Sequence, residues 1–251
     1  MGSLDTTPLS TKNTVLLIEP RKLDEVLIVL YNAYENLGDE WNYVFYCGKS
    51  LKSYWEGKLP KFIEIRPLEL DNFIITEYSD FCKSLDLWKS FDSEYVLTIQ
   101  LDTWIINKEP YTIDYFIKMK KSYIGGNQDI IWNELLRENI NPPIKNFNGG
   151  LSLRKREDMI KIIERYPPQK VLESSTCMEN SHEDAYFVIG CYRLGYPLGD
   201  DDDIFSHFAV HLIYKDEFFG IHQPHENIRE KVNKKNPFLG YINKHLRLVA
   251  V

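Results

Sequence analysis

Short apolar runs alternate with longer helical patterns along the first hundred residues. Four runs have the length and the β-branched or aromatic content of buried strands: 15–19, 43–47, 62–65 and 95–104. After the first run, apolar residues recur at helical spacing from Leu23 to Tyr34, and Gly38 offers a stop. A longer helical pattern extends from Phe73 to Trp88. This alternation predicts an α/β fold with a mostly parallel central sheet and helices on both faces.

After the fourth run the pattern becomes less regular. We expect helices near 111–120 and 128–138, followed by a strand that contains the pair Gly149–Gly150. Antiparallel additions to a parallel half fit this part of the chain. Because no linker or internal repeat interrupts the pattern, we predict a flexible tail at 1–13 and one domain at 14–251.

The composition allows a sizeable core. The chain has 251 residues, of which 43% are hydrophobic and 14% aromatic. Its formal net charge is -7, with both signs mixed along the sequence. A general nucleic-acid binder is disfavoured, because such proteins carry a basic stripe. Any anionic substrate must therefore be held by local cations or by a metal ion, against the overall field.

Cysteine usage and hydropathy bear on the compartment. The four cysteines are widely spaced and form no C-x-x-C pair, which favours a reducing compartment over a disulfide framework. No apolar stretch approaches membrane-spanning length, and the first residues lack a signal-peptide core. We expect a cytoplasmic protein without a membrane span.

The fourth apolar run delivers a carboxylate, since Asp102 lies near its end and precedes Thr103. Open α/β sheets build their ligand sites at the carboxyl ends of strands. Side chains alternate along a strand, so Gln100 and Asp102 should share a face and could meet one ligand. Asp102 could hold a divalent cation that neutralises a departing diphosphate, or it could simply cap the next turn.

A second motif is Asn-Gly-Gly-Leu-Ser-Leu-Arg at 148–154. Gly149 and Gly150 lack a Cβ atom and would let the backbone approach a ligand closely. The commoner use of such a pair is a tight turn that requires positive φ. Arg154, at the end of the motif, could pair with a phosphate or with a carboxylate in the core.

Glu183 and Asp184 open an apolar helical pattern. Acids are favoured in the first turn by the helix dipole, so an ordinary helix start is one interpretation. The functional interpretation is a general base that takes the proton of an attacking hydroxyl. Asp184 is the preferred base and Glu183 the second choice.

His222 lies in a late Gly-Ile-His segment. As a neutral imidazole it could complete a metal site with Asp102 or donate to a diphosphate, although a lone histidine is more often structural. The acidic run at 200–203 follows no buried strand and is interpreted as a solvated loop. His207 and His211 flank strand-like residues, so a strand or buried turn is favoured over a zinc site.

Several signatures are missing from the sequence. It contains no G-x-G-x-x-G and no G-x-x-x-x-G-K-[ST], so dehydrogenase and P-loop hypotheses lack their phosphate cradles. It also contains no G-x-S-x-G nucleophile elbow, which removes the commonest hydrolase signature.

Together the motifs resemble those of GT-A glycosyltransferases. They are most similar to a poorly characterised microbial and viral family with the elements Q-x-D-[ST], Y-I-G-A, G-N-G-G-L-S-L-R, E-D-x-x-F and G-x-H. The matching stretches are 100–103, 123–126, 148–154, 183–187 and 220–222, and residues 17–21 fit the first strand of that family.

The resemblance implies a single GT-A-like domain with a donor-binding front half and an acceptor-binding back half. It implies a nucleoside diphosphate sugar as donor, with UDP expected, and a hydroxyl acceptor on a protein or glycan. A divalent cation, Mn²⁺ or Mg²⁺, would be held by Asp102 and His222, and Asp184 or Glu183 would be the base of an inverting transfer. The expected donor contacts are Pro20, Arg21, Gln100, Asp102, Thr103, Gly149, Gly150 and Arg154.

This chain departs from the pattern at two informative positions. Gln100 replaces the first acid of a D-x-D element, and His211 stands where relatives often carry a glutamate. A catalytically inactive carbohydrate-binding or scaffold protein is therefore one alternative. A nucleotidyltransferase is another, but that chemistry prefers a Gly-rich basic first loop and the chain offers only Pro20-Arg21-Lys22.

Overall fold

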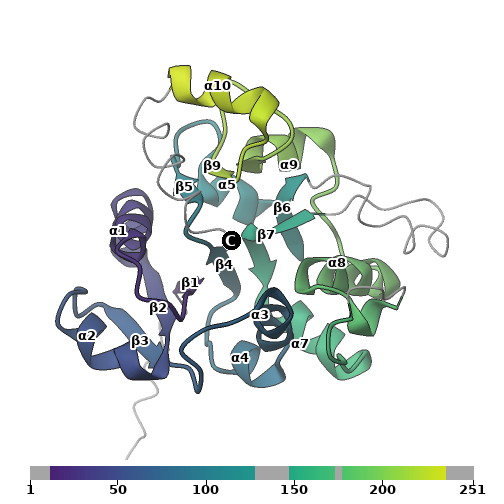
Figure 1. Ribbon diagram of the computed structural model, residues 1–251. Coiled ribbons are helices and arrows are strands. Elements are labelled where there is room, and N and C mark those ends of the chain that lie inside the picture. The colour runs from purple at the N-terminus through teal and green to yellow at the C-terminus, as the bar shows by residue number, and fades with distance from the viewer. Residues whose placement is uncertain (1–11, 128–146, 173–176, 236–251) are drawn as a thin grey trace, which may run out of the picture.

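A six-stranded sheet forms the centre of the protein (Figure 1). The computed structural model describes residues 12–127, 147–172 and 177–235. The strand order is β3-β2-β1-β4-β7-β6. Neighbours among β1 to β4 pair in parallel, whereas β7 runs antiparallel to β4 and to β6. The strands are β1 (Asn13–Ile18), β2 (Trp41–Cys47), β3 (Ile63–Pro67), β4 (Tyr95–Ile99), β6 (Tyr123–Asn127) and β7 (Phe147–Lys155).

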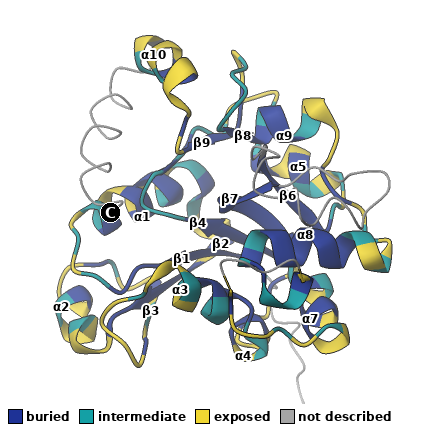
Figure 2. Ribbon diagram, turned by 45° about the vertical axis from the view of Figure 1, so that its right-hand side comes forward, coloured by how far each residue is buried: buried dark blue, intermediate teal, exposed yellow. Residues whose placement is uncertain are grey.

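Helices cover both faces of this sheet. One face carries α1 (Glu25–Leu37), α2 (Lys52–Glu56) and α5 (Ile113–Lys118) over one apolar core. The other face carries α3 (Ile75–Cys82), α4 (Leu85–Lys89), α7 (Arg156–Arg165) and α8 (Glu183–Leu194) over a second core. Figure 2 shows β1, β2, β4, β7 and most of α8 in dark blue, as buried elements. The predicted α/β fold with a mostly parallel, doubly covered sheet is confirmed.

A second, three-stranded sheet lies beside the carboxyl end of β4. It consists of β5 (Thr103–Ile105), β9 (Gly220–His222) and β8 (Ala209–Val210), in the order β5-β9-β8. The remaining elements are α9 (Asp202–Phe208), α10 (Glu226–Lys235) and the 3-10 helices η1 (Gly38–Glu40), η2 (Lys49–Leu51) and η4 (Met178–Asn180). Buried Asn32 of α1 ties β5 to the main body, because its amide bonds both the N–H and the carbonyl of Ile105, at 2.8 and 3.0 Å. No helix in the described residues is long and apolar enough to cross a membrane.

Two predicted elements are broken in the structure. The helical pattern from Phe73 to Trp88 forms two short helices, because Ser84 accepts a hydrogen bond from the Leu87 N–H and starts α4. The apolar run 95–104 was predicted as one strand, yet β4 ends at Ile99. A turn follows, closed by the Thr103 N–H donating to the Gln100 carbonyl at 3.0 Å, and the chain enters β5 in the other sheet.

The boundaries of other elements shift. Gly38, at φ 70°, ends α1 as expected. β1 already begins at Asn13, which the predicted tail had included. The segment around His207 is helical and belongs to α9, so the strand expected there is confined to Ala209–Val210. The helix expected near 128–138 lies outside the described residues.

Candidate functional site

The order of the central strands creates a switch point between β1 and β4. The chain builds β2 and β3 on one side of β1, and then returns to place β4 on the other side. Connections that leave these two strands in opposite directions open a crevice at their carboxyl ends, where open α/β sheets bind ligands. The segment Glu19–Arg21 follows β1, and Gln100–Asp102 follows β4. Two of the predicted donor-binding segments therefore follow the carboxyl ends of neighbouring strands.

Asp102 and His222 are in direct contact. The Nε2 atom of His222 lies 3.0 Å from Oδ1 of Asp102. The cause is the pairing of β5 with β9, which sets Thr103 opposite His222 in antiparallel register. Burial alone would raise the pKa of the Asp102 carboxyl, but the charge of His222 and its hydrogen bond lower it. Asp102 therefore stays ionised beside His222.

Gln100 joins the same group through the turn after β4. Its Oε1 atom lies 3.2 Å from His222 Nε2, and its Nε2 atom donates to the Tyr78 hydroxyl at 3.2 Å. The expectation that Gln100 and Asp102 share a strand face is wrong, because β4 has already ended. They still reach one partner, since the turn aims both side chains at His222.

Thr103 stabilises this turn. Its hydroxyl accepts from the Gln100 N–H at 3.1 Å and donates to the Gly150 carbonyl at 3.0 Å. The side chain is buried and both hydrogen bonds are internal. The structure thus gives Thr103 a positioning role between β4 and β7.

Gly149 and Gly150 lie inside β7 and have ordinary φ angles, so a turn with positive φ does not explain them. They are needed for close approach. A Cβ atom on Gly150 would lie 2.0 Å from His222 Nε2, and one on Gly149 would lie 2.1 Å from Glu183 Oε1. The backbone is approached by the protein's own polar side chains at both positions.

Arg154 and Glu183 form a buried ion pair beneath Gly149. Arg154 Nη1 lies 2.8 Å from Glu183 Oε2, and both side chains are less than a tenth exposed. Nε of Arg154 donates to Ser152 Oγ at 2.8 Å, and the guanidinium lies over the ring of Tyr123. Of the two partners expected for Arg154, the structure therefore provides the core carboxylate, and Glu183 is engaged by it.

Asp184 differs from its neighbour Glu183. It is half-buried in the first turn of α8, where its Oδ1 atom accepts from the Ala185 N–H at 2.7 Å. Burial, reinforced by the charge of Glu183, raises the pKa of the Asp184 carboxyl to about 7. A group of this pKa can both take and release a proton near neutrality.

The two halves of the candidate site meet at the glycine pair. Glu183 and His222 lie 2.1 and 2.0 Å from Cβ positions on consecutive residues. Because neighbouring Cα atoms are about 3.8 Å apart, the Glu183 carboxylate and the His222 imidazole lie within roughly 11 Å of each other. In the described residues no hydrogen bond joins Asp184 to Asp102 directly. The first turn of α8 and the Asp102–His222 pair thus border the same part of β7.

The donors at this edge fit a divalent cation. In the described ranges no three His, Cys, Asp or Glu side chains converge on one point. Asp102 and His222 nevertheless offer a carboxylate oxygen and an imidazole nitrogen 3.0 Å apart. Neighbouring ligands of an octahedral ion with bonds of about 2.1 Å have a similar separation of about 3.0 Å. Such ions often use one or two protein carboxylates and take further ligands from substrate phosphates and water.

Arg21 lies in the loop that follows β1 and is held by Glu19. The Nε and Nη2 atoms of Arg21 each lie 2.8 Å from an oxygen of that carboxylate. Pro20 is buried, and its carbonyl accepts from the Gly48 N–H at 3.1 Å. The loop after β1 is thereby fixed in place with its guanidinium oriented by a salt bridge.

Sequence reasoning missed Tyr78 and assigned no site role to His211. Tyr78 lies in a helical pattern that reads as ordinary core, and only its hydroxyl contact with Gln100 reveals a second role. His211 Nδ1 lies 3.0 Å from the His222 carbonyl. Burial, and then the neighbouring His222, lower the pKa of His211 to about 4, so that it is neutral at pH 7. The sequence signal that could have pointed to His211 was its departure from the family pattern, in which relatives often carry a glutamate.

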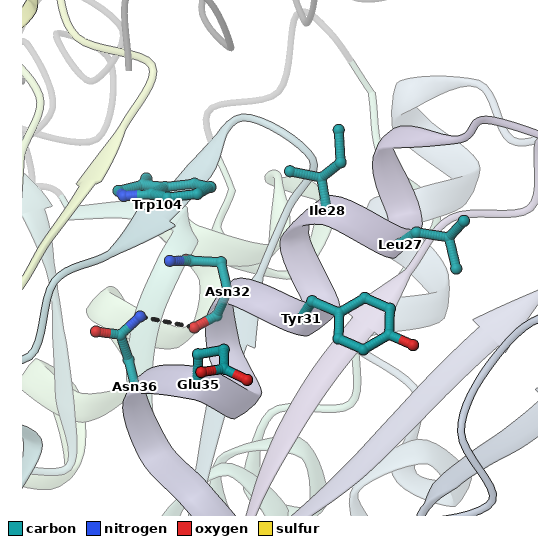
Figure 3. A pocket seen from close by; sticks show the side chains of 7 residues that line it. All are labelled: Leu27, Ile28, Tyr31, Asn32, Glu35, Asn36 and Trp104. Atoms are coloured by element: carbon teal, nitrogen blue, oxygen red, sulfur yellow. Dashed lines mark hydrogen bonds between the residues drawn. The ribbon is translucent and has the colours of Figure 1, made fainter. Parts of the chain in front are cut away.

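A shallow hollow of about 490 Å³ lies elsewhere, between α1 and β5. Figure 3 shows it between the indole of Trp104 and side chains of α1, which include Ile28 and Asn32. Because side chains alternate along β5, Trp104 faces away from the side on which Thr103 meets Gly150. None of the predicted site residues lines this hollow.

The fold and the site define a mixed α/β protein with a polar cluster at the switch point of a mostly parallel sheet. The chain belongs to the family described as "Protein of unknown function (DUF5672)", whose pattern matches residues 62–223. That match includes every predicted site residue except Pro20 and Arg21. No curated protein matches the chain.

Among solved structures, the chain is similar to the mannosyltransferase PcManGT from Pyrobaculum calidifontis, in complex with GDP-Man and Mn²⁺. The two share 15% sequence identity at a TM-score of 0.47. The similarity covers 74% of this chain and 53% of that one, so the chain spans about half the length of the mannosyltransferase.

Proposed function

We propose that this protein transfers a sugar from a nucleoside diphosphate sugar, with UDP the expected nucleotide, to a hydroxyl of a protein or glycan. The observation that carries the proposal is the pairing of two features along β7. One is the Asp184 carboxyl, whose pKa is raised to about 7. The other is the Asp102–His222 pair at the switch point of the sheet. A base tuned to neutrality beside a cation- and phosphate-binding edge fits glycosyl transfer.

Asp184 supplies the proton acceptor in this reaction. The oxygen of the acceptor hydroxyl attacks the anomeric carbon while its proton moves to the Asp184 carboxylate. The bond between that carbon and the diphosphate oxygen breaks, and the electron pair leaves with the diphosphate. A single displacement of this kind inverts the configuration at the anomeric carbon. The buried Arg154–Glu183 pair anchors the first turn of α8 and so holds Asp184 in position.

Asp102 and His222 are proposed to serve the diphosphate. A divalent cation bound there would neutralise the negative charge that develops on the leaving group. The ionised state of Asp102 favours such binding, and the pKa of its carboxyl lies below the usual value. Gly150 leaves room at this point, since any side chain would overlap His222 and Gln100.

The proposal can be tested with a panel of UDP, GDP, CDP and dTDP sugars. Incubation of the protein with each donor and Mn²⁺ should release the nucleoside diphosphate from at least one, by transfer or by slow transfer to water. Proton NMR of the freshly formed product should show the anomeric configuration opposite to that of the donor. Thermal melting gives an independent readout, because a ligand at a hundred times its Kd adds about 2.7 kcal/mol to the stability.

The alternatives give different results in the same assays. An inactive carbohydrate-binding or scaffold protein would show no release from any donor. A nucleotidyltransferase would release pyrophosphate from nucleoside triphosphates instead. The salt bridge from Arg21 to Glu19 argues against the latter, because it engages the arginine of the first loop with a carboxylate.

A further inference from the structure

The amide of Gln100 is held from both ends. Its oxygen faces His222 Nε2 at 3.2 Å, and its nitrogen donates to the Tyr78 hydroxyl at 3.2 Å. An amide has one accepting end and one donating end, so the two contacts are not interchangeable. Tyr78 belongs to α3, on the face of the sheet that also carries α8.

The group around His222 Nε2 contains more acceptors than it can satisfy. Oδ1 of Asp102 and Oε1 of Gln100 both accept, at 3.0 and 3.2 Å, and a neutral imidazole has at most one proton at Nε2. The Nδ1 atom of the same ring is buried without a hydrogen-bond partner among the described residues. Two oxygens therefore lie within hydrogen-bond distance of one nitrogen, with a single proton available to share.

We propose that Gln100 Oε1 is a third protein donor to the divalent cation, and that Tyr78 is the positioning residue that keeps this oxygen turned toward it. The inference rests on the metal-binding part of the proposed function. Both measured separations, 3.0 and 3.2 Å, are close to the spacing of about 3.0 Å between neighbouring ligands of an octahedral ion. Gln100, which looks like a loss of the first acid, thereby supplies a neutral oxygen in its place.

Tyr78 is needed because His222 must lose any proton at Nε2 before this atom can bind a cation. Without that proton, His222 no longer selects the oxygen end of Gln100. The hydrogen bond from Gln100 Nε2 to Tyr78 then keeps the oxygen turned toward the site until the cation binds.

A carboxylate at position 100 would not need this help, because its two oxygens are equivalent. The test therefore measures the affinity for Mn²⁺ alone, by electron paramagnetic resonance of the free ion, in two backgrounds. In the natural chain, Gln100→Ala and Tyr78→Phe should each weaken Mn²⁺ binding about tenfold or more, as loss of an outer-shell partner does in other metal sites. In a Gln100→Glu background, Tyr78→Phe should leave the affinity within about twofold. Tyr46→Phe is the matched control, since its hydroxyl contacts Ser90 and Arg66 instead.

Equal Mn²⁺ affinity of Tyr78→Phe and the unaltered protein would overturn the inference. So would an equal loss in the Gln100→Glu background, which would reveal a general structural effect of Tyr78. An unaltered protein that binds no Mn²⁺ would also end it, while leaving metal-independent sugar transfer open. If no donor is turned over and the Mn²⁺ pattern holds, the proposed function fails and the metal-donor assignment stands.

Discussion

The Oε1 atom of Glu183 lies where the side chain of residue 149 would begin. A Cβ atom on Gly149 would stand 2.1 Å from that oxygen and 2.9 Å from Arg154 Nη2. The glycine is therefore required by the close approach of α8 to β7, since its φ angle is ordinary. This contact seats the first turn of α8, and with it Asp184, against the strand.

Gly149→Ala should destabilise the protein strongly. The new methyl group must displace Glu183 from Arg154, and breaking a buried ion pair costs about 3–5 kcal/mol. We expect a loss of about 3 kcal/mol in the free energy of unfolding, measured by urea denaturation. Gly57→Ala is the control, because its Cβ would lie 3.6 Å from the nearest atom and should change stability by about 0.5 kcal/mol or less. Equal effects of the two substitutions would contradict the steric argument.

Asp184→Asn should abolish sugar transfer and spare donor binding. An amide cannot accept the acceptor proton, and a positioned general base contributes about 10²–10⁴ in rate. We expect kcat to fall by about that factor, with the thermal shift produced by the nucleotide unchanged. Asp200→Asn, at an exposed position before α9, should retain full activity. Comparable kcat values for these two variants would remove Asp184 from the mechanism.

The rate of transfer should depend on pH through Asp184. The base must be deprotonated, so kcat should rise with pH and level off above about 7, the pKa of this carboxyl. Glu183→Gln should move this limb to lower pH, because the charge of Glu183 raises the pKa of Asp184. Single-turnover rates between pH 5 and 9 would measure this rise in the unaltered protein and in Glu183→Gln. If the pH profile of Glu183→Gln matched that of the unaltered protein, the pH dependence of the rate would not arise from Asp184.

The same raised pKa should make the stability of the protein fall between acidic and neutral pH. The folded carboxyl titrates near 7, and an unfolded aspartate near 3.9. The folded state thus binds more protons between these values, and stability falls as pH rises through that window. Asp184→Asn removes the penalty, so it should raise Tm more at pH 8 than at pH 4.5. Calorimetry at pH 8 and at pH 4.5 tests this. An equal change in Tm at the two pH values would contradict the raised pKa of Asp184.

Removal of divalent cations should suppress transfer. Chelation with EDTA should lower turnover, and added Mn²⁺ should restore it, if Asp102 and His222 hold a cation at the diphosphate. Asp102→Asn keeps the shape of the side chain and removes its charge, so about tenfold or more Mn²⁺ should be needed for half-maximal rate. Asp200→Asn should respond to Mn²⁺ like the unaltered protein. If EDTA leaves turnover unchanged, cationic side chains are sufficient to neutralise the diphosphate.

Local patterns determined much of the fold. Apolar runs predicted β1, β2 and the start of β4, and helical spacing with a terminal glycine predicted α1. These elements follow from interactions between residues near in sequence, together with burial of one face. The pattern from Phe73 to Trp88 misled because apolar spacing continues across the break at Ser84. The run 95–104 misled similarly, since residues buried in two different sheets look like one strand.

The sequence by itself also singled out several polar groups of the candidate site, though not Tyr78, because acids and histidines among apolar runs stand out from their surroundings. Only the tertiary structure decided their partners. It joined His222 to Asp102, Arg154 to Glu183 and Tyr78 to Gln100. Each pair links segments that are distant in the chain, through strand register or helix packing that no local period encodes. Burial makes these pairings necessary, since a charged or polar group removed from water requires a partner within reach.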